Sequence, residues 1–318
     1  MAIIGYNIQA AIEWLEKGEV VAIPTETVYG LAANIFFPDA IEKVYKVKGR
    51  PASNPLIVHV ADIEQARRLV RFFPETALKL AKHFWPGPLT IIFDKSELVP
   101  VTVTAGQATV AIRVPDHPLL LQLLQSYNKP LAAPSANPFN YISPVTAEQV
   151  NRMLGNKIPY ILDGGRCKKG IESTIVAFED EKVKLLRPGA IAAAEIESVL
   201  QHNVVEAGKT GLAHPGMFKQ HYSPNTRLLL VEEITVDLLK KNSGKIALVL
   251  YNKYCSFHDK EKQYLLSLNA QPEEAAWNLY DILHRLDEQD YDLIIAEKMP
   301  ETGIGKAIND RLTKASQR

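Results

Sequence analysis

Two cations, Lys48 and Arg50, stand at the end of a predicted helix, where they could bind an anionic ligand. Residues 39–48 have the apolar spacing of a helix, and Lys48 continues the apolar stripe that includes Ile41. A cation on that stripe is costly unless an anion lies opposite it. Gly49, between the two cations, permits a tight turn that suits close approach to phosphate. A basic helix end that complements the helix dipole would explain the same residues equally well.

Further polar groups lie in or beside predicted strands. Ser135 and Asn137 are two residues apart, so an extended segment directs both to one side, where they could bind phosphate; an ordinary turn is the alternative. Arg113 interrupts an apolar run and needs a carboxylate or phosphate partner, supplied by a ligand or by an internal ion pair. His59 lies in another apolar run and could bind a ligand or be a hydrogen-bonded structural residue.

The elements that would position these groups alternate along the first 200 residues. Amphipathic helical patterns lie near residues 8–15, 39–48, 77–84 and 119–124, between strand-like runs. The predicted strands cover residues 19–24, 55–60, 89–93, 109–114, 130–133, 160–162, 173–178 and 183–186. This alternation predicts an α/β layer fold.

The periodicity fails between residues 202 and 225, a stretch rich in Gly, Pro, His and Lys. Strand and helix patterns resume beyond it. We therefore predict a larger α/β domain at 1–201, an interdomain linker at 202–225 and a smaller α/β domain at 226–318. Within the linker, bends fixed by Pro and Gly flank His221 and Tyr222, which suggests a lid over a cleft instead of a passive tether.

The composition narrows the classes of function. The chain has 36 Lys and Arg against 36 Asp and Glu, so general attraction to nucleic acid or a membrane surface is not expected. Cys167 and Cys255 are isolated, which signals neither a zinc site nor a disulfide framework. No signal peptide or membrane span is evident, and a cytoplasmic location is expected. Small ligands are the favoured partners.

Taken in order, a set of motifs strongly resembles the YrdC-like threonylcarbamoyl-adenylate synthases, in their long two-domain form. These motifs are PTETVYGLAAN (24–34), KGRPASNPLIVHV (48–60), FWPGPLTIIF (84–93), TVAIRVPDHP (109–118), PSAN (134–137), GIESTIV (170–176), LRPGAI (186–191), HPGMFKQHYSP (214–224) and GIGKAINDRLTKAS (303–316). The resemblance implies a YrdC-like twisted, open, mixed sheet flanked by helices, followed by a smaller C-terminal Rossmann-like α/β domain.

The resemblance also implies a reaction. L-threonine and bicarbonate would form an N-carboxy amino acid, whose carboxylate attacks the α-phosphate of ATP, giving threonylcarbamoyl-AMP and pyrophosphate. The catalytic cations would be Lys48 and Arg50. ATP would be held by Arg50, Asn54, Thr109, Ser135, Ser143, Arg187 and Tyr222. Threonine would be held by Thr27, His59, Arg113, Ala133 and Ser173. Mg²⁺ would be bound mainly through the ATP phosphates, without protein ligands of its own.

The product would pass to a tRNA threonylcarbamoyl transferase; contact with tRNA itself is allowed by this scheme but not required. One departure from the family pattern is Asn140, which stands where a glycine is usual and can adopt the same left-handed backbone conformation. Two rival functions fit this sequence less well. A carbamoyl-phosphate-using relative would carry zinc-binding cysteines in a longer chain, and an RNA-binding module would carry a basic surface interleaved with aromatic residues.

Overall fold

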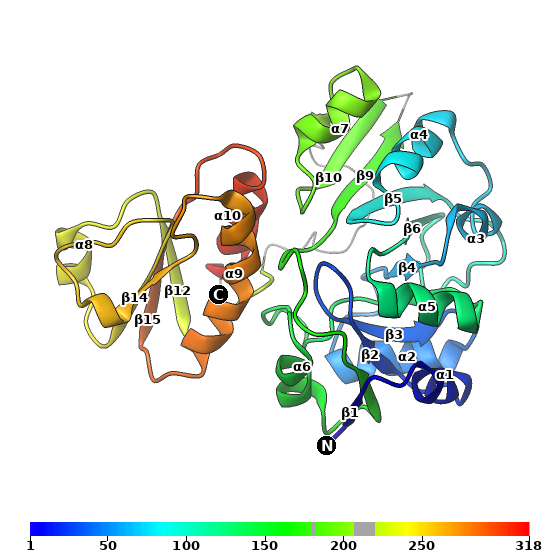
Figure 1. Cartoon of the computed structure of the whole chain (residues 1–318), viewed down its shortest axis with the longest axis horizontal. Coiled ribbons are helices and arrows are strands. Elements are labelled where there is room, and N and C mark those ends of the chain that lie inside the picture. The colour runs from blue at the N-terminus through cyan, green and yellow to red at the C-terminus, as the bar shows by residue number, and fades with distance from the viewer. Residues whose placement is uncertain (180–181, 207–219, 318) are drawn as a thin grey trace.

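The computed structural model describes residues 1–179, 182–206 and 220–317, which form two α/β units, each built on its own sheet (Figure 1). The described part of the first unit holds an eleven-stranded sheet. Its spatial order is β1 (Ile3–Gly5), β8 (Tyr160–Leu162), β2 (Val21–Ile23), β3 (Gly30–Asn34), β7 (Leu131–Ala132), β4 (Ile57–His59), β6 (Thr109–Arg113), β5 (Leu89–Asp94), β9 (Thr174–Glu179), β10 (Lys182–Arg187) and β11 (Val205–Glu206). It contains both parallel pairs, such as β1 with β8 and β4 with β6, and antiparallel pairs, such as β2 with β3 and β5 with β6, so the expected mixed sheet is confirmed.

Helices cover both faces of this sheet, which is why its strands read as continuous apolar runs. Along β3, Ala32 joins the core under one face, while Leu31 and Ala33 join the core under the other. The first core is closed by α1 (Ile8–Glu16) and α5 (Pro118–Tyr127). The second is closed mainly by α2 (Pro38–Lys48), α4 (Glu75–Phe84), α6 (Ala147–Leu154) and α7 (Ala193–Leu200), and the short helix α3 (Ile63–Arg68) lies beside it.

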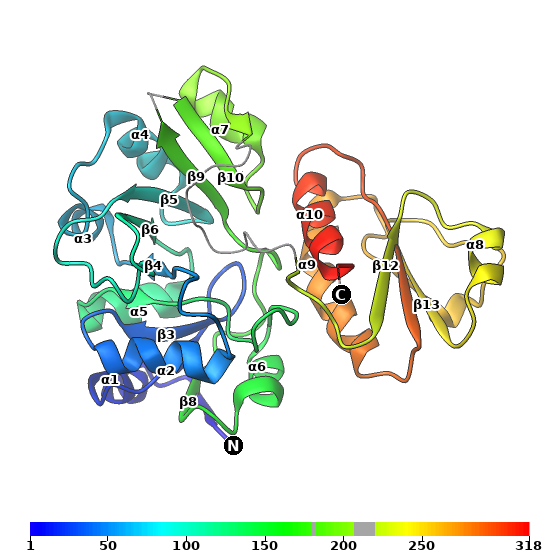
Figure 2. The same ribbon diagram turned by 180° about the vertical axis from the view of Figure 1, so that it is seen from behind.

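The second unit has a four-stranded sheet in the order β12 (Arg227–Val231), β15 (Leu293–Glu297), β13 (Ile246–Leu250) and β14 (Gln263–Leu265). Its pairs are all parallel, as the expected Rossmann-like arrangement requires. In both views α9 (Pro272–Asp287) and α10 (Gly305–Ala315) lie on the side of this sheet that faces the first unit (Figures 1 and 2). The remaining helices are α8 (Val236–Lys241) and the short 3₁₀ helix η1 (Lys260–Lys262).

The segment between the units begins inside the region predicted as the linker. The large sheet extends to β11, which ends at Glu206, and the small sheet begins at Arg227. Residues 207–219, which include the first part of the predicted lid at 216–224, lie outside the described residues. The domain boundaries at 201 and 225 therefore stay predictions. Within the described ranges, every helix is too short or too polar to cross a membrane.

Candidate active site

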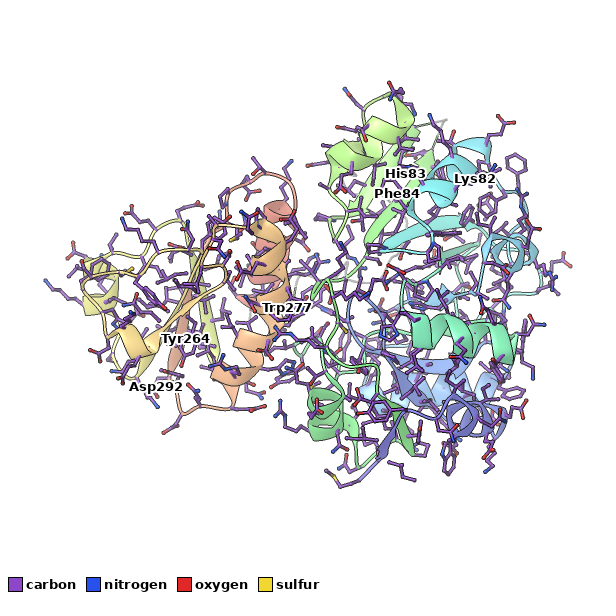
Figure 3. All side chains as sticks on the ribbon, in the orientation of Figure 1. Lys82, His83, Phe84, Tyr264, Trp277 and Asp292 are labelled. Carbon is purple, nitrogen blue, oxygen red and sulfur yellow. The ribbon has the colours of Figure 1, made fainter. Side chains whose placement is uncertain are left out.

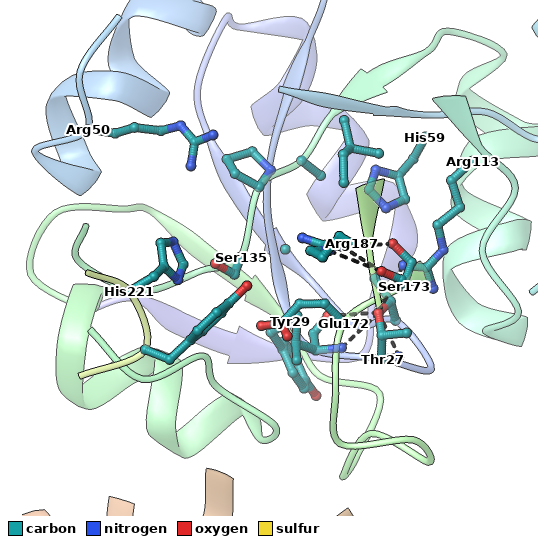
Figure 4. A pocket seen from close by; sticks show the side chains of 17 residues that line it. Thr27, Tyr29, Arg50, His59, Arg113, Ser135, Glu172, Ser173, Arg187 and His221 are labelled. Carbon is teal, nitrogen blue, oxygen red and sulfur yellow. Dashed lines mark hydrogen bonds between the residues drawn. The ribbon is translucent and has the colours of Figure 1, made fainter. Parts of the chain in front are cut away.

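A buried pocket lies where strand ends and loops of the first unit meet the segment that leads to the second (Figure 4). Its wall includes the turn between β2 and β3, the ends of β4, β6 and β10, and the segments that follow β7 and precede β9. The lining residues are Thr25, Thr27, Val28, Tyr29, Gly30, Arg50, Ile57, His59, Arg113, Ala133, Pro134, Ser135, Glu172, Ser173, Arg187, His221 and Tyr222. Most residues predicted to bind substrates therefore meet at one place.

The predicted residues also separate within the pocket. Figure 4 shows His59, Arg113, Thr27 and Ser173 grouped on one side, with Arg50 and His221 on the opposite side and Arg187 between them. The first group contains residues predicted to bind threonine, and Arg50 and Arg187 were predicted to bind ATP. Ala133, Ser135 and Tyr222 complete the set of predicted residues that line the wall.

Arg113, at the end of β6, has the internal ion pair that the sequence analysis gave as one alternative. It forms a buried ion pair with Glu26, with Nη2 2.5 Å from Oε1. Its Nη1 donates to Thr27 Oγ1 at 2.9 Å and its Nε to the carbonyl oxygen of Gly87 at 3.2 Å. A guanidinium has five N–H groups, so two remain for a ligand. Thr25 in turn holds the side chain of Thr27, through a 2.7 Å contact between the Oγ1 atoms of the two residues.

His59 ends β4 directly beside Arg113, because the two residues are register partners in the sheet. Burial, together with the Arg113 charge, lowers the pKa of His59 to about 3. The imidazole is therefore neutral at physiological pH, and its Nδ1 has no hydrogen-bond partner among the described residues. A neutral ring with a free nitrogen in the wall of a pocket can exchange a hydrogen bond with a ligand.

Ser173 and Arg187 connect the two sides of the pocket. Arg187 donates from Nη2 to the Ser173 carbonyl oxygen at 2.7 Å and to its Oγ at 3.1 Å. The Ser173 hydroxyl also contacts Thr90 Oγ1 at 2.7 Å. Gly189 makes this arrangement possible, since a Cβ at that position would lie 2.4 Å from the Ser173 carbonyl carbon. The turn after β10 therefore requires glycine for close approach.

Arg50 is held by the loop that precedes β4. Its Nε donates to the Asn54 carbonyl oxygen at 3.2 Å and its Nη2 to that of Pro55 at 2.8 Å, which leaves Nη1 for the pocket. Burial lowers the pKa of Arg50 to about 10, so it stays cationic at neutral pH. Asn54 supports Arg50 through its backbone, and its own side-chain amide is buried without a hydrogen-bond partner among the described residues.

Lys48 lies beside backbone carbonyl oxygens and not in the pocket wall. It is buried as expected, but its Nζ donates to the carbonyl oxygens of Ser135 and Asn137, at 2.5 and 2.6 Å, and it does not line the pocket. Two backbone carbonyl oxygens accept two of the three ammonium N–H groups, and the expectation that an anion lies opposite Lys48 stays a prediction. The lysine ties the end of α2 to the segment that carries Ser135.

Three other predicted residues also lie outside the pocket wall. Asn54 lies behind Arg50. Thr109 begins β6, so it lies at the opposite end of that strand from Arg113, about 13 Å away at 3.3 Å per residue. Ser143 donates from Oγ to Glu172 Oε1 at 2.7 Å. For ATP to touch all of them, it would have to extend well beyond the pocket.

Glu172 is a pocket residue that sequence reasoning did not single out. Although burial opposes ionisation, the Arg311 and Arg187 guanidinium groups hold the pKa of Glu172 down at about 2. A carboxylate inside the motif GIESTIV was the available signal, because it interrupts an apolar run next to Ser173. The partner Arg311 belongs to the second unit, and nothing in the local sequence indicates it.

Two backbone conformations shape the side near the second unit. Asn140 has φ of 66°, so the predicted left-handed conformation is confirmed. Tyr222 also has a positive φ, 63°, which is uncommon for a residue other than glycine. Its ring is buried and lies 4.0 Å from that of His221 and 5.9 Å from that of Tyr280. Tyr222 is thus held in place by packing on both sides.

Comparison with known proteins gives matches along the whole chain. The family described as "Telomere recombination" matches residues 13–189, more than half of the chain, and the family described as "Threonylcarbamoyl-AMP synthase, C-terminal domain" matches residues 191–317. A threonylcarbamoyl-AMP synthase of Bacillus subtilis is 41% identical, with 98% of this chain and 93% of the relative covered. One of Pyrococcus abyssi is 38% identical, with 98% and 94% covered.

Solved structures agree with these sequence matches. The crystal structure of P. abyssi Sua5 complexed with L-threonine matches with a TM-score of 0.90 at 36% identity, covering 99% of this chain and 97% of that one. The structure of YciO from E. coli matches with a TM-score of 0.55 at 24% identity, covering 59% of this chain and 96% of that one. The match to YciO shows a likeness of fold alone. It covers nearly all of YciO and little more than half of this chain, as a likeness to one of the two units would.

Proposed function

The chain belongs to the threonylcarbamoyl-AMP synthase family, and from that premise we propose that its pocket joins L-threonine, bicarbonate and ATP into threonylcarbamoyl-AMP, with release of pyrophosphate. The observation that carries the assignment of the pocket is the placement of three arginines, Arg50, Arg113 and Arg187, around one buried cavity. The triphosphate, the carbamate and the amino-acid carboxylate are all anions, and guanidinium groups bind such oxygens through fixed forks of donors.

The side of the pocket with Arg113 is the threonine subsite. The two remaining N–H groups of Arg113 bind the threonine carboxylate, and Thr27 keeps the guanidinium in place. Neutral His59 accepts a hydrogen bond from the threonine ammonium or hydroxyl. Ser173 and the backbone at Ala133 complete the subsite. The amino nitrogen is the group that reacts, after it has lost a proton.

In the first chemical step the threonine amine, once deprotonated, forms a C–N bond to the carbon of bicarbonate, and water leaves. In the second step a carbamate oxygen forms a bond to the α-phosphorus of ATP, and the bond to the pyrophosphate oxygen breaks. The protein contributes position and charge, because no covalent intermediate with a side chain is needed. Arg50 and Arg187 face the phosphates, where negative charge is redistributed as pyrophosphate departs.

Mg²⁺ enters as the partner of ATP. The described residues contain no group of three or more His, Cys, Asp or Glu side chains arranged to hold a metal ion. The phosphate side of the pocket presents guanidinium, hydroxyl and imidazole groups, which suit phosphate oxygens better than a hard cation. Mg²⁺ would therefore be held by the ATP phosphates and water, where it would neutralise phosphate charge. Lys48 acts indirectly, by fixing the segment that carries Ser135.

Part of the pocket wall must move when substrates bind. The cavity measures about 50 Å³, far below the roughly 300–1,000 Å³ usual for ligand pockets. His221 and Tyr222 belong to the segment between the two units and not to the large sheet. In this structure they are held by packing against each other and against Tyr280 and Arg311, so they can move without a change in the large sheet once that packing is released. Their displacement opens the nucleotide side, and their return excludes water from a reactive mixed anhydride.

The product leaves for a second enzyme. Threonylcarbamoyl-AMP hydrolyses readily, so we propose transfer to a tRNA threonylcarbamoyl transferase in the cytoplasm, for which this chain needs no tRNA contact of its own.

An isotope experiment tests the proposed reaction. The purified protein is incubated with ATP, Mg²⁺, L-threonine and ¹³C-bicarbonate, and the adenylate product is analysed by mass spectrometry. One ¹³C per adenylate, together with one pyrophosphate released, supports the reaction. Formation of unlabelled threonyl-AMP, with the amino acid joined directly to AMP, contradicts it.

A further inference from the structure

Arg311 links the second unit to the pocket. It lies on α10 in the C-terminal motif 303–316, and its side chain is 1% exposed. Its Nε donates to Glu172 Oε2 at 2.7 Å, and its Nη2 donates to the Pro188 carbonyl oxygen at 3.0 Å. The same guanidinium lies 5.1 Å from the centre of the Tyr222 ring, within the range of a cation–π contact.

Each of these three contacts adjoins a residue of the substrate site. Glu172 directly precedes Ser173, which belongs to the threonine subsite. Pro188 directly follows Arg187, on the phosphate side. Tyr222 is itself part of the wall. One buried side chain from the second unit thus touches the three segments that bring together both subsites.

Tyr280 on α9 contacts two of the same residues, Glu172 and Tyr222. Its hydroxyl contacts both carboxylate oxygens of Glu172, at 3.0 and 2.8 Å, and its ring stacks on that of Tyr222 with an interplanar angle of 28°. Ser143 supplies a further hydrogen bond to Glu172. The buried carboxylate therefore has partners from both units, as a buried charge requires.

We infer that Arg311 is a positioning residue for the reaction, and that the C-terminal unit completes the active site by fixing the segments that carry Ser173, Arg187 and Tyr222. This inference rests on the proposed function. A guanidinium spans the three contacts because its donors point outward in a rigid planar fork. Lysine, with one compact ammonium group, can keep the charge opposite Glu172 and cannot also reach Pro188 while covering the tyrosine ring.

A second contact between the units provides a matched control. Arg166 in the first unit stacks on Trp277 of α9, with its guanidinium 3.4 Å from the ring centre, and donates to the Trp277 carbonyl oxygen at 3.0 Å. Figure 3 shows Trp277 on the side of α9 that faces the first unit. Arg166 does not line the pocket. Arg166→Gln therefore loosens the junction without disturbing the segments that Arg311 holds.

The test compares the full-length wild type with Arg311→Lys, Tyr280→Phe and Arg166→Gln, at a temperature where thermal unfolding shows each to be folded. Pyrophosphate release gives kcat and KM for threonine and for ATP. For Arg311→Lys we expect both KM values to rise about tenfold or more, since misplacing binding groups by about 1 Å can cost on the order of 10²-fold. Arg166→Gln is expected to lower the unfolding temperature and leave both KM values near those of the wild type.

Tyr280→Phe separates the support that α9 gives to Glu172 from the support that it gives to Tyr222. It removes the hydroxyl contacts to Glu172 and keeps the ring that stacks on Tyr222. The KM for threonine should rise a few-fold, while the KM for ATP should stay near the wild-type value. Because the change is small, the variant remains informative if Arg311→Lys fails to fold.

Three results would overturn the inference. They are wild-type KM values in Arg311→Lys with only a lower unfolding temperature, an equal rise of both KM values in Arg166→Gln, and an unchanged threonine KM in Tyr280→Phe. A wild-type protein that releases no pyrophosphate from threonine, bicarbonate and ATP would instead refute the proposed function, so the two failures are distinguishable.

Discussion

Replacement of Arg113 by lysine separates a binding role from a purely structural one. Arg113 donates three of its five N–H groups to Gly87, Thr27 and Glu26, which leaves two for the threonine carboxylate. A lysine ammonium can keep the ion pair with Glu26 but offers the carboxylate at most one well-placed donor. The loss amounts to about one charge-assisted hydrogen bond, or about 1.5–3 kcal/mol. That predicts a rise of about 10- to 150-fold in the KM for threonine.

The assay is steady-state pyrophosphate release, with threonine and ATP varied separately, supported by calorimetric titration of threonine into the protein. The KM for ATP should stay within a few-fold of the wild-type value, since Arg50 and Arg187 are unchanged. Arg152→Lys is the matched control, because Arg152 is ion-paired with Glu288 at 2.8 Å and lies outside the pocket wall. The reasoning is refuted if Arg113→Lys lowers the unfolding temperature and binds threonine with wild-type affinity.

Four further predictions concern other parts of the site. Arg50→Ala should raise the KM for ATP about tenfold or more, through loss of a charge-assisted contact, with little change in the KM for threonine in the same kinetic assay. Gly189→Ala should lower stability to urea by about 1–3 kcal/mol and raise the KM for threonine, because the added Cβ would lie 2.4 Å from the Ser173 carbonyl carbon. Tyr222→Ala should increase the share of adenylate lost to hydrolysis, measured by chromatography as AMP relative to intact product; an unchanged share would show that the ring does not exclude water. Burial lowers the pKa of His59 from 6.5 in the unfolded chain to about 3 in the folded protein, so the unfolded chain takes up the proton first as pH falls. His59 should therefore reduce the free energy of unfolding by about 1.4 kcal/mol for each pH unit below 6.5. Urea titrations of His59→Gln at several pH values should show a shallower fall.

The sequence predicted the residues of the site better than their partners. Arg113 and His59 could be recognised as exceptional because each interrupts an apolar run, and both line the pocket. The partner of Arg113 could not be recognised, because Glu26 comes from a distant segment that only the sheet brings near. Lys48 shows the same limit. Its burial followed from helical spacing, but spacing does not reveal that the atoms opposite are carbonyl oxygens.

The fold class was predictable, while some elements were not. Alternating strand-like and helical patterns were sufficient for an α/β arrangement of two units. Strand β3, GLAAN, contains no β-branched residue, and its local sequence gives little strand preference. It forms because β2 and β7 flank it and both faces are covered. Arg311 was likewise invisible as part of the site, since its role depends on how the second unit lies against the first.

The central claim is that the nucleophile is a carbamate made from threonine and bicarbonate. The most direct test measures pyrophosphate release from ATP and Mg²⁺ in rigorously degassed buffer, with threonine alone, bicarbonate alone, both, or serine with bicarbonate. We predict substantial release only when threonine and bicarbonate are both present, and slower release with serine, whose missing methyl group costs about 1 kcal/mol of apolar contact. Release with threonine at an undiminished rate after complete removal of bicarbonate would contradict the account.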